Sequence, residues 1–112
     1  MNSSTKITNK KSVDPLDKLI LEKGLRASYL VIDKKLDLLL VVLNNGKVLR
    51  DKISGYPRLK TASQKQLDKW ELIGKGIAIQ WRHLDEDLSI KGMIKSTALD
   101  QAISLLQEKE KA

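Results

Sequence analysis

The feature that most constrains the fold is an apolar segment followed at once by a strong turn signal. Residues 36–43 read LDLLLVVL, and this nearly unbroken apolar run predicts a strand that is central in a sheet and buried on both faces. The next residues, Asn44-Asn45-Gly46, tolerate the positive φ angles of a tight hairpin turn. Residues 47–53 then place Leu49 and Ile53 on one face of a further strand. Together these segments predict an antiparallel hairpin.

Two more segments have the composition of strands. Residues 27–32 (ASYLVI) precede the hairpin and are joined to it by the turn Asp33-Lys34-Lys35. In residues 77–82, the apolar side chains fall on alternate positions, which is typical of a half-buried strand. The sequence therefore predicts an α+β fold: an antiparallel four-stranded sheet, made of a meander plus one strand and packed by short helices on one face.

The predicted helices are marked by their caps. Asp14 and Pro15 open a helix over residues 15–23, which ends at Gly24. The pattern Ser63-Gln64-Lys65-Gln66 is a capping box and opens a helix over 64–72. Gly74 and Gly76 then suit the end of that helix and a tight entry to the next strand.

The C-terminal region predicts two further helical pieces. Ser89 caps a single turn over residues 90–94, and Thr97 caps a last helix over residues 97–108. In that last helix Leu99, Ile103 and Leu106 form an apolar stripe.

The length of 112 residues fits one domain. Residues 1–13 are polar and rich in lysine, and predict a disordered tail ahead of a single α+β domain over residues 14–112. The chain has no cysteine, which excludes disulfides and thiolate metal sites and favours a cytoplasmic protein. No apolar segment is long enough to form a signal sequence or to span a bilayer, so we expect no membrane association.

The chain has a net charge of +7, and the excess of basic residues is concentrated between Leu25 and Thr61. Such an excess can attract nucleic acid or an acidic partner, or can simply keep the protein soluble. The candidate nucleic-acid contacts are Arg50, Lys52, Arg58 and Lys60.

An acidic triplet, Asp85-Glu86-Asp87, lies between Leu84 and Leu88 and predicts an exposed loop. The triplet is a candidate binding surface for a partner, or a solvated loop without a ligand. Its spacing lacks the alternation and the glycine of a calcium loop, so we predict no metal site. His83 is the only histidine, and no nucleophile elbow or phosphate-binding loop is present. We therefore expect neither an enzyme nor a cofactor.

The aromatic residues allow two interpretations. Trp70 and Trp81 could stack on nucleic-acid bases, but both fall on apolar faces of predicted elements, which favours a place in the core. Tyr56, beside Pro57 in a loop, is the aromatic residue with the better prospect of exposure.

Several motifs between Asn45 and Ile94 resemble a bacterial family, the domain of unknown function 2442 (DUF2442). The matching pieces are Asn45-Gly46, the segment YPRL over residues 56–59, WELIG over 70–74, and IQWRHLDEDLSIKG over 79–92. The last piece carries the specific pattern W-x-x-L-D-E-D-L-S-x-x-G. The residues that carry the resemblance are Tyr56, Pro57, Trp70, Gly74, Trp81, Leu84, Asp85, Asp87 and Leu88.

The chain departs from the family pattern at one strand. The family commonly has histidine where Gln80 stands, and proline followed by an acid where Arg82 and His83 stand. If the family histidine had a chemical role, this chain could not perform it in the same way.

The resemblance implies no particular chemistry, because the family has no established activity, but its members resemble accessory proteins and often one half of a paired small operon. Together with the acidic triplet and the amphipathic end helices, this favours a non-enzymatic protein-interaction module, antitoxin-like or accessory, whose partner is a small, toxin-like protein. Some related chains add a helix-turn-helix, whereas here the C-terminal helix stands alone. The alternative is a regulatory protein that binds nucleic acid through the basic strand and loop. A homo-oligomer is compatible with both hypotheses.

Overall fold

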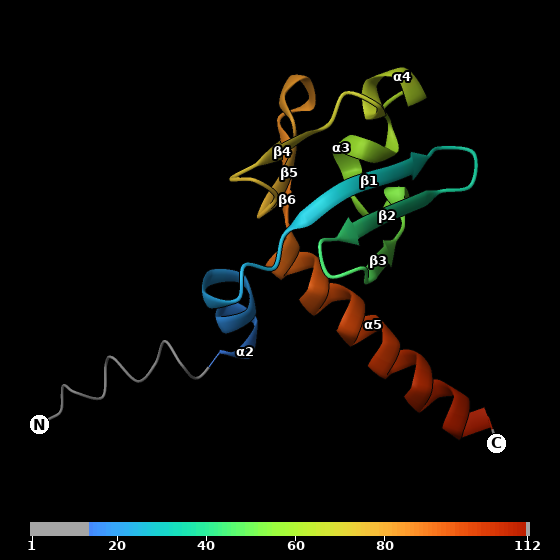
Figure 1. Cartoon of the computed structure of the whole chain (residues 1–112). Coiled ribbons are helices and arrows are strands. Elements are labelled where there is room, and N and C mark those ends of the chain that lie inside the picture. The colour runs from blue at the N-terminus through green and yellow to red at the C-terminus, as the bar shows by residue number, and fades with distance from the viewer. Residues whose placement is uncertain (1–13, 112) are drawn as a thin grey trace, which may run out of the picture.

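The structure is a computed structural model that describes residues 14–111 and contains two separate three-stranded antiparallel sheets (Figure 1). Sheet A has the strand order β1-β2-β3 and sheet B has the order β4-β5-β6. The strands of sheet A are β1 (Ala27–Asp33), β2 (Leu38–Leu43) and β3 (Val48–Asp51). Those of sheet B are β4 (Glu71–Ile73), β5 (Ala78–Trp81) and β6 (Glu86–Ser89).

Short helical segments connect the strands, and one long helix ends the chain. In Figure 1 this long helix, α5, begins below sheet B and runs out past β3, away from both sheets. The helical elements are α2 (Pro15–Asp17), the π-helical η1 (Lys18–Glu22), the 3₁₀ turns η2 (Ile53–Gly55) and η3 (Arg82–Leu84), α3 (Pro57–Lys60), α4 (Gln64–Leu67) and α5 (Ile90–Lys111).

The α+β class is confirmed, but the prediction of one four-stranded sheet is wrong. The hairpin and its preceding strand form sheet A as a meander, with β2 in the centre as predicted. The prediction that β2 is buried on both faces is wrong, because only alternate residues are buried and nothing described covers the other face fully. The predicted fourth strand does not join that meander. It is β5, the central strand of sheet B, and it pairs with β4 and β6. Both neighbours are short strands, in segments that were predicted to be the end of a helix and an exposed loop.

The first missed strand is β4, which falls partly inside the helix predicted over residues 64–72. The capping box is present, yet α4 ends at Leu67 after about one turn, and Trp70 lies outside it. Leu72 instead pairs with Ile79 across sheet B. Gly74 has a φ of 58° and helps to close the β4–β5 hairpin rather than to end a helix. Tertiary pairing has here overridden a local helical pattern.

The second missed strand is β6, which the sequence analysis treated as an exposed acidic loop. The segment pairs with β5 along its length, with Leu88 buried and Asp87 exposed. This is the two-residue alternation of a strand that covers the core with one face. The acidic residues hid the alternation, because a single buried leucine carries it.

The C-terminal correction concerns α5, which is one continuous helix of 22 residues rather than a turn followed by a second helix. Ser89 acts as the predicted cap, because the Gly92 N–H donates to its Oγ at 3.0 Å. Thr97 lies inside the helix, and its hydroxyl donates to the Ile94 carbonyl at 3.2 Å. No glycine or proline follows Gly92, so nothing in the sequence interrupts the helix.

At the N-terminal end, the predicted cap is confirmed. The Asp14 carboxylate accepts from the Leu16 N–H at 2.9 Å, and Gly24 has a φ of 75° where the helical segment has ended. The disordered tail predicted over residues 1–13 lies outside the described residues.

The core lies between the sheets and the short helices. Trp81 is fully buried, and its Nε1–H donates to the Leu67 carbonyl at 2.8 Å, which joins sheet B to α4. A second join is made at Gly76, whose carbonyl accepts from the Ala27 N–H at 2.7 Å. A side chain at Gly76 would collide with the backbone of Ala27, so this approach requires glycine. The other fully buried residues include Leu39, Val41, Leu59, Leu67, Ile79 and Ile90.

Candidate partner-binding surfaces

The predicted acidic surface is present in part. Asp85 has a left-handed backbone with a φ of 52°, between η3 and β6, and its side chain is 98% exposed. Asp87 is also exposed, whereas Glu86 is half-buried. The three carboxylates therefore do not form one uniform acidic loop.

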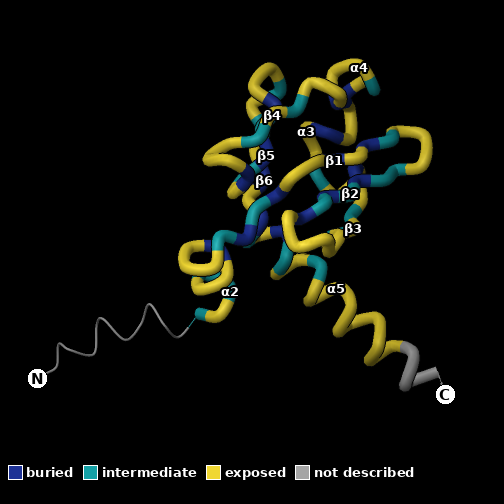
Figure 2. Tube along the Cα trace, in the orientation of Figure 1, coloured by how far each residue is buried: buried dark blue, intermediate teal, exposed yellow. Residues whose placement is uncertain are grey.

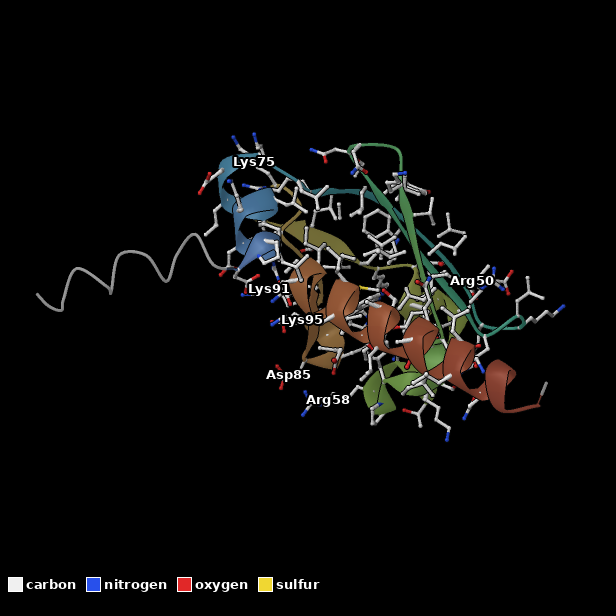
Figure 3. All side chains as sticks on the ribbon, turned by 90° about the horizontal axis from the view of Figure 1, so that it is seen from below. Arg50, Arg58, Lys75, Asp85, Lys91 and Lys95 are labelled. Carbon is white, nitrogen blue, oxygen red and sulfur yellow. The ribbon has the colours of Figure 1, made fainter. Side chains whose placement is uncertain are left out.

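Arg58 lies against this acidic segment, although the sequence analysis assigned it to the opposing basic surface. Its Nη1 donates to the Asp85 carbonyl and lies 3.6 Å from the Asp85 carboxylate and 4.0 Å from that of Glu86. Figure 3 shows Arg58 and Asp85 side by side. Arg58, a predicted nucleic-acid contact, thus neutralises Asp85, a predicted partner contact. Because these pairs are mostly exposed, their contribution to stability is small.

The remaining basic candidates do not gather with Arg58. Arg50 extends from β3, and Figure 3 places it well away from Arg58 and Asp85. Lys52 follows β3 and is exposed. Lys60 ends α3, where its carbonyl accepts from the Lys34 ammonium at 3.0 Å. The four predicted nucleic-acid contacts are therefore not a single continuous surface.

The aromatic residues have mainly structural contacts. Trp81 is in the core, as predicted. Trp70 follows α4, is half-buried, and contacts the Tyr29 ring edge-on with 5.3 Å between ring centres. Tyr56 is half-buried, and its hydroxyl donates to the Asp51 carboxylate at 2.5 Å. Burial and this hydrogen bond raise the pKa of Tyr56 far above its ordinary value.

The residues of the family motif mostly shape the backbone or fill the core. Pro57 is the first residue of α3, Gly74 adopts a left-handed conformation, and Leu88 is buried in sheet B. The departures from the family pattern are on the surface: Gln80 pairs across the strands with Glu71, and Arg82 forms an ion pair with Glu71 at 3.0 Å. His83, also exposed, contacts the Gln66 carbonyl through Nε2 at 3.0 Å.

The most exposed apolar surface was not among the predicted binding residues. It is the outer half of α5, where Leu99, Ile103, Leu105 and Leu106 are 44–63% exposed. Figure 2 shows the described residues of this half of the helix in the colour of exposed residues, in contrast to the start of the helix. The sequence predicts the stripe on an amphipathic C-terminal helix, but its spacing alone does not show whether the domain covers that stripe.

Two general findings limit the kinds of site in the described part of the chain. Within residues 14–111, no cluster of three or more histidine, aspartate or glutamate side chains could hold a metal ion. None of the helices described there is both long and apolar enough to cross a membrane.

Two solved structures have a similar fold. One is the crystal structure of a protein of unknown function from Rhodospirillum rubrum, which is 30% identical, with a TM-score of 0.58 over 65% of this chain and 88% of that one. The other is the solution NMR structure of an uncharacterized protein from Chromobacterium violaceum, which is 18% identical, with a TM-score of 0.60 over 85% of this chain and 84% of that one. No curated protein matches the sequence.

The fold thus defines a class of small α+β proteins built from two three-stranded sheets and a C-terminal helix. The model of the family described as "Protein of unknown function (DUF2442)" matches residues 33–97, which is more than half of the chain. The protein belongs to this family.

Proposed function

We propose that this protein is a non-enzymatic interaction module that binds a small partner protein, in the manner of an antitoxin or an accessory protein of a paired operon. The outer half of α5 is the binding element, and it lies in an apolar groove of the partner. Recognition of a helix in a groove typically uses apolar side chains at spacings of three and four residues. Leu99, Ile103 and Leu106 have this spacing.

The observation that carries the proposal is a change of apolar face along α5. Near its start, the helix buries Ile90 and Met93 against the core. An α-helix turns by about 100° per residue, so Leu99, Ile103 and Leu106 lie on roughly the opposite side of the axis. The stripe therefore faces away from the surface on which α5 packs.

The residues that continue the buried face are polar. Helical geometry places Gln101 and Ser104 on the side of Ile90 and Met93, and both are exposed. Along the outer half of α5, the side that continues the line of Ile90 and Met93 is thus polar, with Leu105 at its margin, and the opposite side is apolar. An apolar stripe of this kind is a feature of interaction sites rather than of a helix that covers its own core.

The acidic segment has a smaller role in this proposal than the sequence suggested. Arg58 already balances Asp85 and Glu86, so Asp87 is the one carboxylate of this acidic segment that forms no ion pair with another described residue. A basic rim on the partner would then contact Asp87, which lies near the start of α5 along a shallow groove that also contains Ser89 and Gly92.

The test is binding to the small protein that a tagged copy of this chain captures from the native host, measured by calorimetry with purified proteins. The variant Leu99→Glu/Ile103→Glu should lose at least tenfold in affinity, because it places two charges in an apolar groove. The matched control is Gln101→Glu/Ser104→Glu, which adds the same charges on the other side of the same helix. Equal losses in both variants, or no binding by the unchanged protein, would contradict the proposal.

A capture experiment from the native host distinguishes binding of a partner protein from the rival hypothesis, binding of nucleic acid. The tagged protein should retain its small partner after nuclease treatment and at high salt, and the Leu99→Glu/Ile103→Glu variant should not. Nucleic acid that is captured and then lost at high salt would favour the basic residues instead, because each phosphate contact depends on counterion release.

A further inference from the structure

A second apolar surface lies on sheet A, on the face turned away from the core. Its members alternate with the buried residues of the same strands. Tyr29 and Val48 are 56% and 51% exposed, Val31 is also exposed, and the central strand adds half-buried leucine and valine side chains. The cross-strand rows of this open face are Tyr29–Val42–Val48 and Val31–Leu40–Arg50, followed by Asp33–Leu38.

Sheet B shows that the fold does not require such a face. Its inner row is apolar, with Leu72, Ile79 and Leu88 in register. Its open face instead carries the polar row Glu71–Gln80–Asp87. This is the usual pattern for an antiparallel sheet with one face in water. The open face of sheet A departs from it.

The charged residues around this open face are divided between its two sides. Asp33 ends β1, and Asp68 lies beside that strand, next to a cavity lined also by Tyr29, Val31 and Trp70. Arg50 is on β3, at the other edge, and forms no ion pair among the described residues. Lys52 follows it on the same side. On the face itself, the acidic side chain of Asp33 is therefore at the β1 edge and the basic side chain of Arg50 is at the β3 edge, while Lys34 and Lys35 follow Asp33 in the turn beyond the face.

We propose that the open face of sheet A binds the same face of a second copy of the chain, about a two-fold axis parallel to β2. Two sheets that pack face to face keep their strands nearly aligned, about 10 Å apart. A two-fold axis in this direction places β1 of each copy over β3 of the other. The row of Asp33 lies two residues along the strands from the row of Arg50, an offset of about 7 Å. The long Arg50 side chain of one copy spans this offset to reach Asp33 of its partner, and the contact occurs twice by symmetry.

The charge arrangement favours a second copy of the chain over other molecules as the partner of this face. A face with one acidic and one basic edge is complementary to its own rotated copy, whereas a uniformly charged partner would meet one repulsive edge. The face measures about 14 Å by 17 Å from strand spacing and rise. Since this is smaller than a standard interface of about 800 Å² per partner, we expect a dimer that dissociates on dilution.

This inference does not depend on the proposed function. The open face lies on β1, β2 and β3, whereas partner binding uses Leu99, Ile103 and Leu106 on α5. The Leu99→Glu/Ile103→Glu variant should therefore still form the dimer. A dimer without a partner protein, or a partner without a dimer, would show which of the two proposals has failed.

Sedimentation equilibrium of the full chain, over a wide range of concentrations, tests the dimer. The unchanged protein should associate reversibly at the higher concentrations. The variants Asp33→Lys and Arg50→Glu should each shift the dissociation constant upward by at least tenfold, because both place like charges in contact at two symmetric positions. A protein that stays monomeric throughout would overturn the proposal.

The two variants then provide a sharper test when they are mixed. In a mixed pair, Lys at position 33 of one chain meets Glu at position 50 of the other, and the unchanged Arg50 meets the unchanged Asp33. The mixture should therefore dimerise where neither variant does alone. Within one chain, residues 33 and 50 lie on opposite edges of the sheet, so no intramolecular pair explains such a rescue. A mixture that stays monomeric would overturn the two-fold arrangement.

Controls separate the interface from the fold. The Asp33 carboxylate also accepts from the Leu36 N–H at 3.2 Å, so Asp33→Asn, which keeps an acceptor but not the charge, should weaken the dimer without lowering the unfolding temperature. Lys35→Glu, in the turn beyond the open face, should change the dimer little.

Discussion

The two sheets of this protein have the same number of strands and the same antiparallel order, but their open faces differ. Sheet B is mainly polar on the side away from the core, where its rows are Glu71–Gln80–Asp87 and Ile73–Ala78–Ser89. Sheet A is apolar on both sides, so that Leu39 is fully buried while its neighbour Leu40 faces outward and is half-buried.

This difference shows that one apolar face is enough to pack a sheet on the core of this fold. Sheet B packs on the shared core with one apolar face, made by Ile79, Trp81 and Leu88 and by the partly buried Leu72. The second apolar face of sheet A is therefore not needed to explain the fold. An apolar surface without a structural role in the monomer is best explained by contact with another molecule.

The largest expected effect comes from a pair of substitutions at adjacent positions in β2, which tests whether the two faces of sheet A differ in their contribution to stability. Leu39→Ala removes a fully buried side chain and should lower the free energy of unfolding by about 2–5 kcal/mol. Leu40→Ala, on the open face, should cost about 1 kcal/mol at low protein concentration, because the side chain is only half-buried. Urea unfolding monitored by tryptophan fluorescence measures both. Similar losses would mean that both faces of sheet A belong to the monomer core.

A second substitution tests the join between the sheets. Gly76→Ala should cost about 1–2 kcal/mol from the unfavourable positive φ and about 1–3 kcal/mol from disruption of the Ala27 hydrogen bond. Gly46→Ala, which also has a positive φ but open space, should cost only the first amount. The same urea measurement compares the two variants. Equal effects would show that the approach of Gly76 to Ala27 does not hold the sheets together.

The pH dependence of stability tests the hydrogen bond from the Tyr56 hydroxyl to the Asp51 carboxylate. Burial and the Asp51 carboxylate raise the pKa of the Tyr56 hydroxyl, so the folded protein retains this proton at a pH where the unfolded chain loses it. The stabilisation is therefore complete below pH 10 and is lost as the pH rises above it. Urea unfolding between pH 8 and pH 11.5 should show this decline. In Tyr56→Phe the decline should be weaker, and an identical slope in both proteins would refute the assignment.

The smallest expected effect concerns Lys91, which links α5 to α2 rather than to either sheet. Its ammonium lies 2.7 Å from the Asp17 carboxylate and 3.1 Å from that of Asp14. The hydrogen bond from Lys91 lowers the pKa of Asp14, so this link is present at neutral pH and is lost as the pH falls through the folded pKa. Lys91→Met should speed amide exchange in residues 15–23 and leave exchange in both sheets unchanged. Faster exchange throughout the chain would show a wider role.

Local signals predicted those parts of the fold that depend on a few adjacent residues. Asp14 and Ser63 cap helical segments, Gly46 closes the hairpin, and β2 is the central strand of its sheet. In each case the physical cause lies within about four residues of the position concerned. The family resemblance was also visible in the sequence and is confirmed.

The missed strands depended on partners that are distant in the sequence. β4 has helix-compatible residues, and β6 has a single buried leucine, so each becomes a strand only when β5 offers hydrogen bonds on both sides. The prediction of separate acidic and basic surfaces was wrong for a related reason. Arg58 and Asp85 are far apart in the sequence, and only the packing of α3 beside η3 and β6 brings them together.

The sequence by itself determined the family, the α+β class and the apolar stripe of α5, because composition, turn residues and helical spacing are properties of the chain alone. The tertiary structure decided which apolar residues are covered. Leu39 and Leu40 have the same side chain, and so do Leu67 and Leu106, yet one of each pair is buried in the core and the other is not. The division depends on which surfaces the folded chain brings together, and it leaves the open face of sheet A and the outer half of α5 for other molecules.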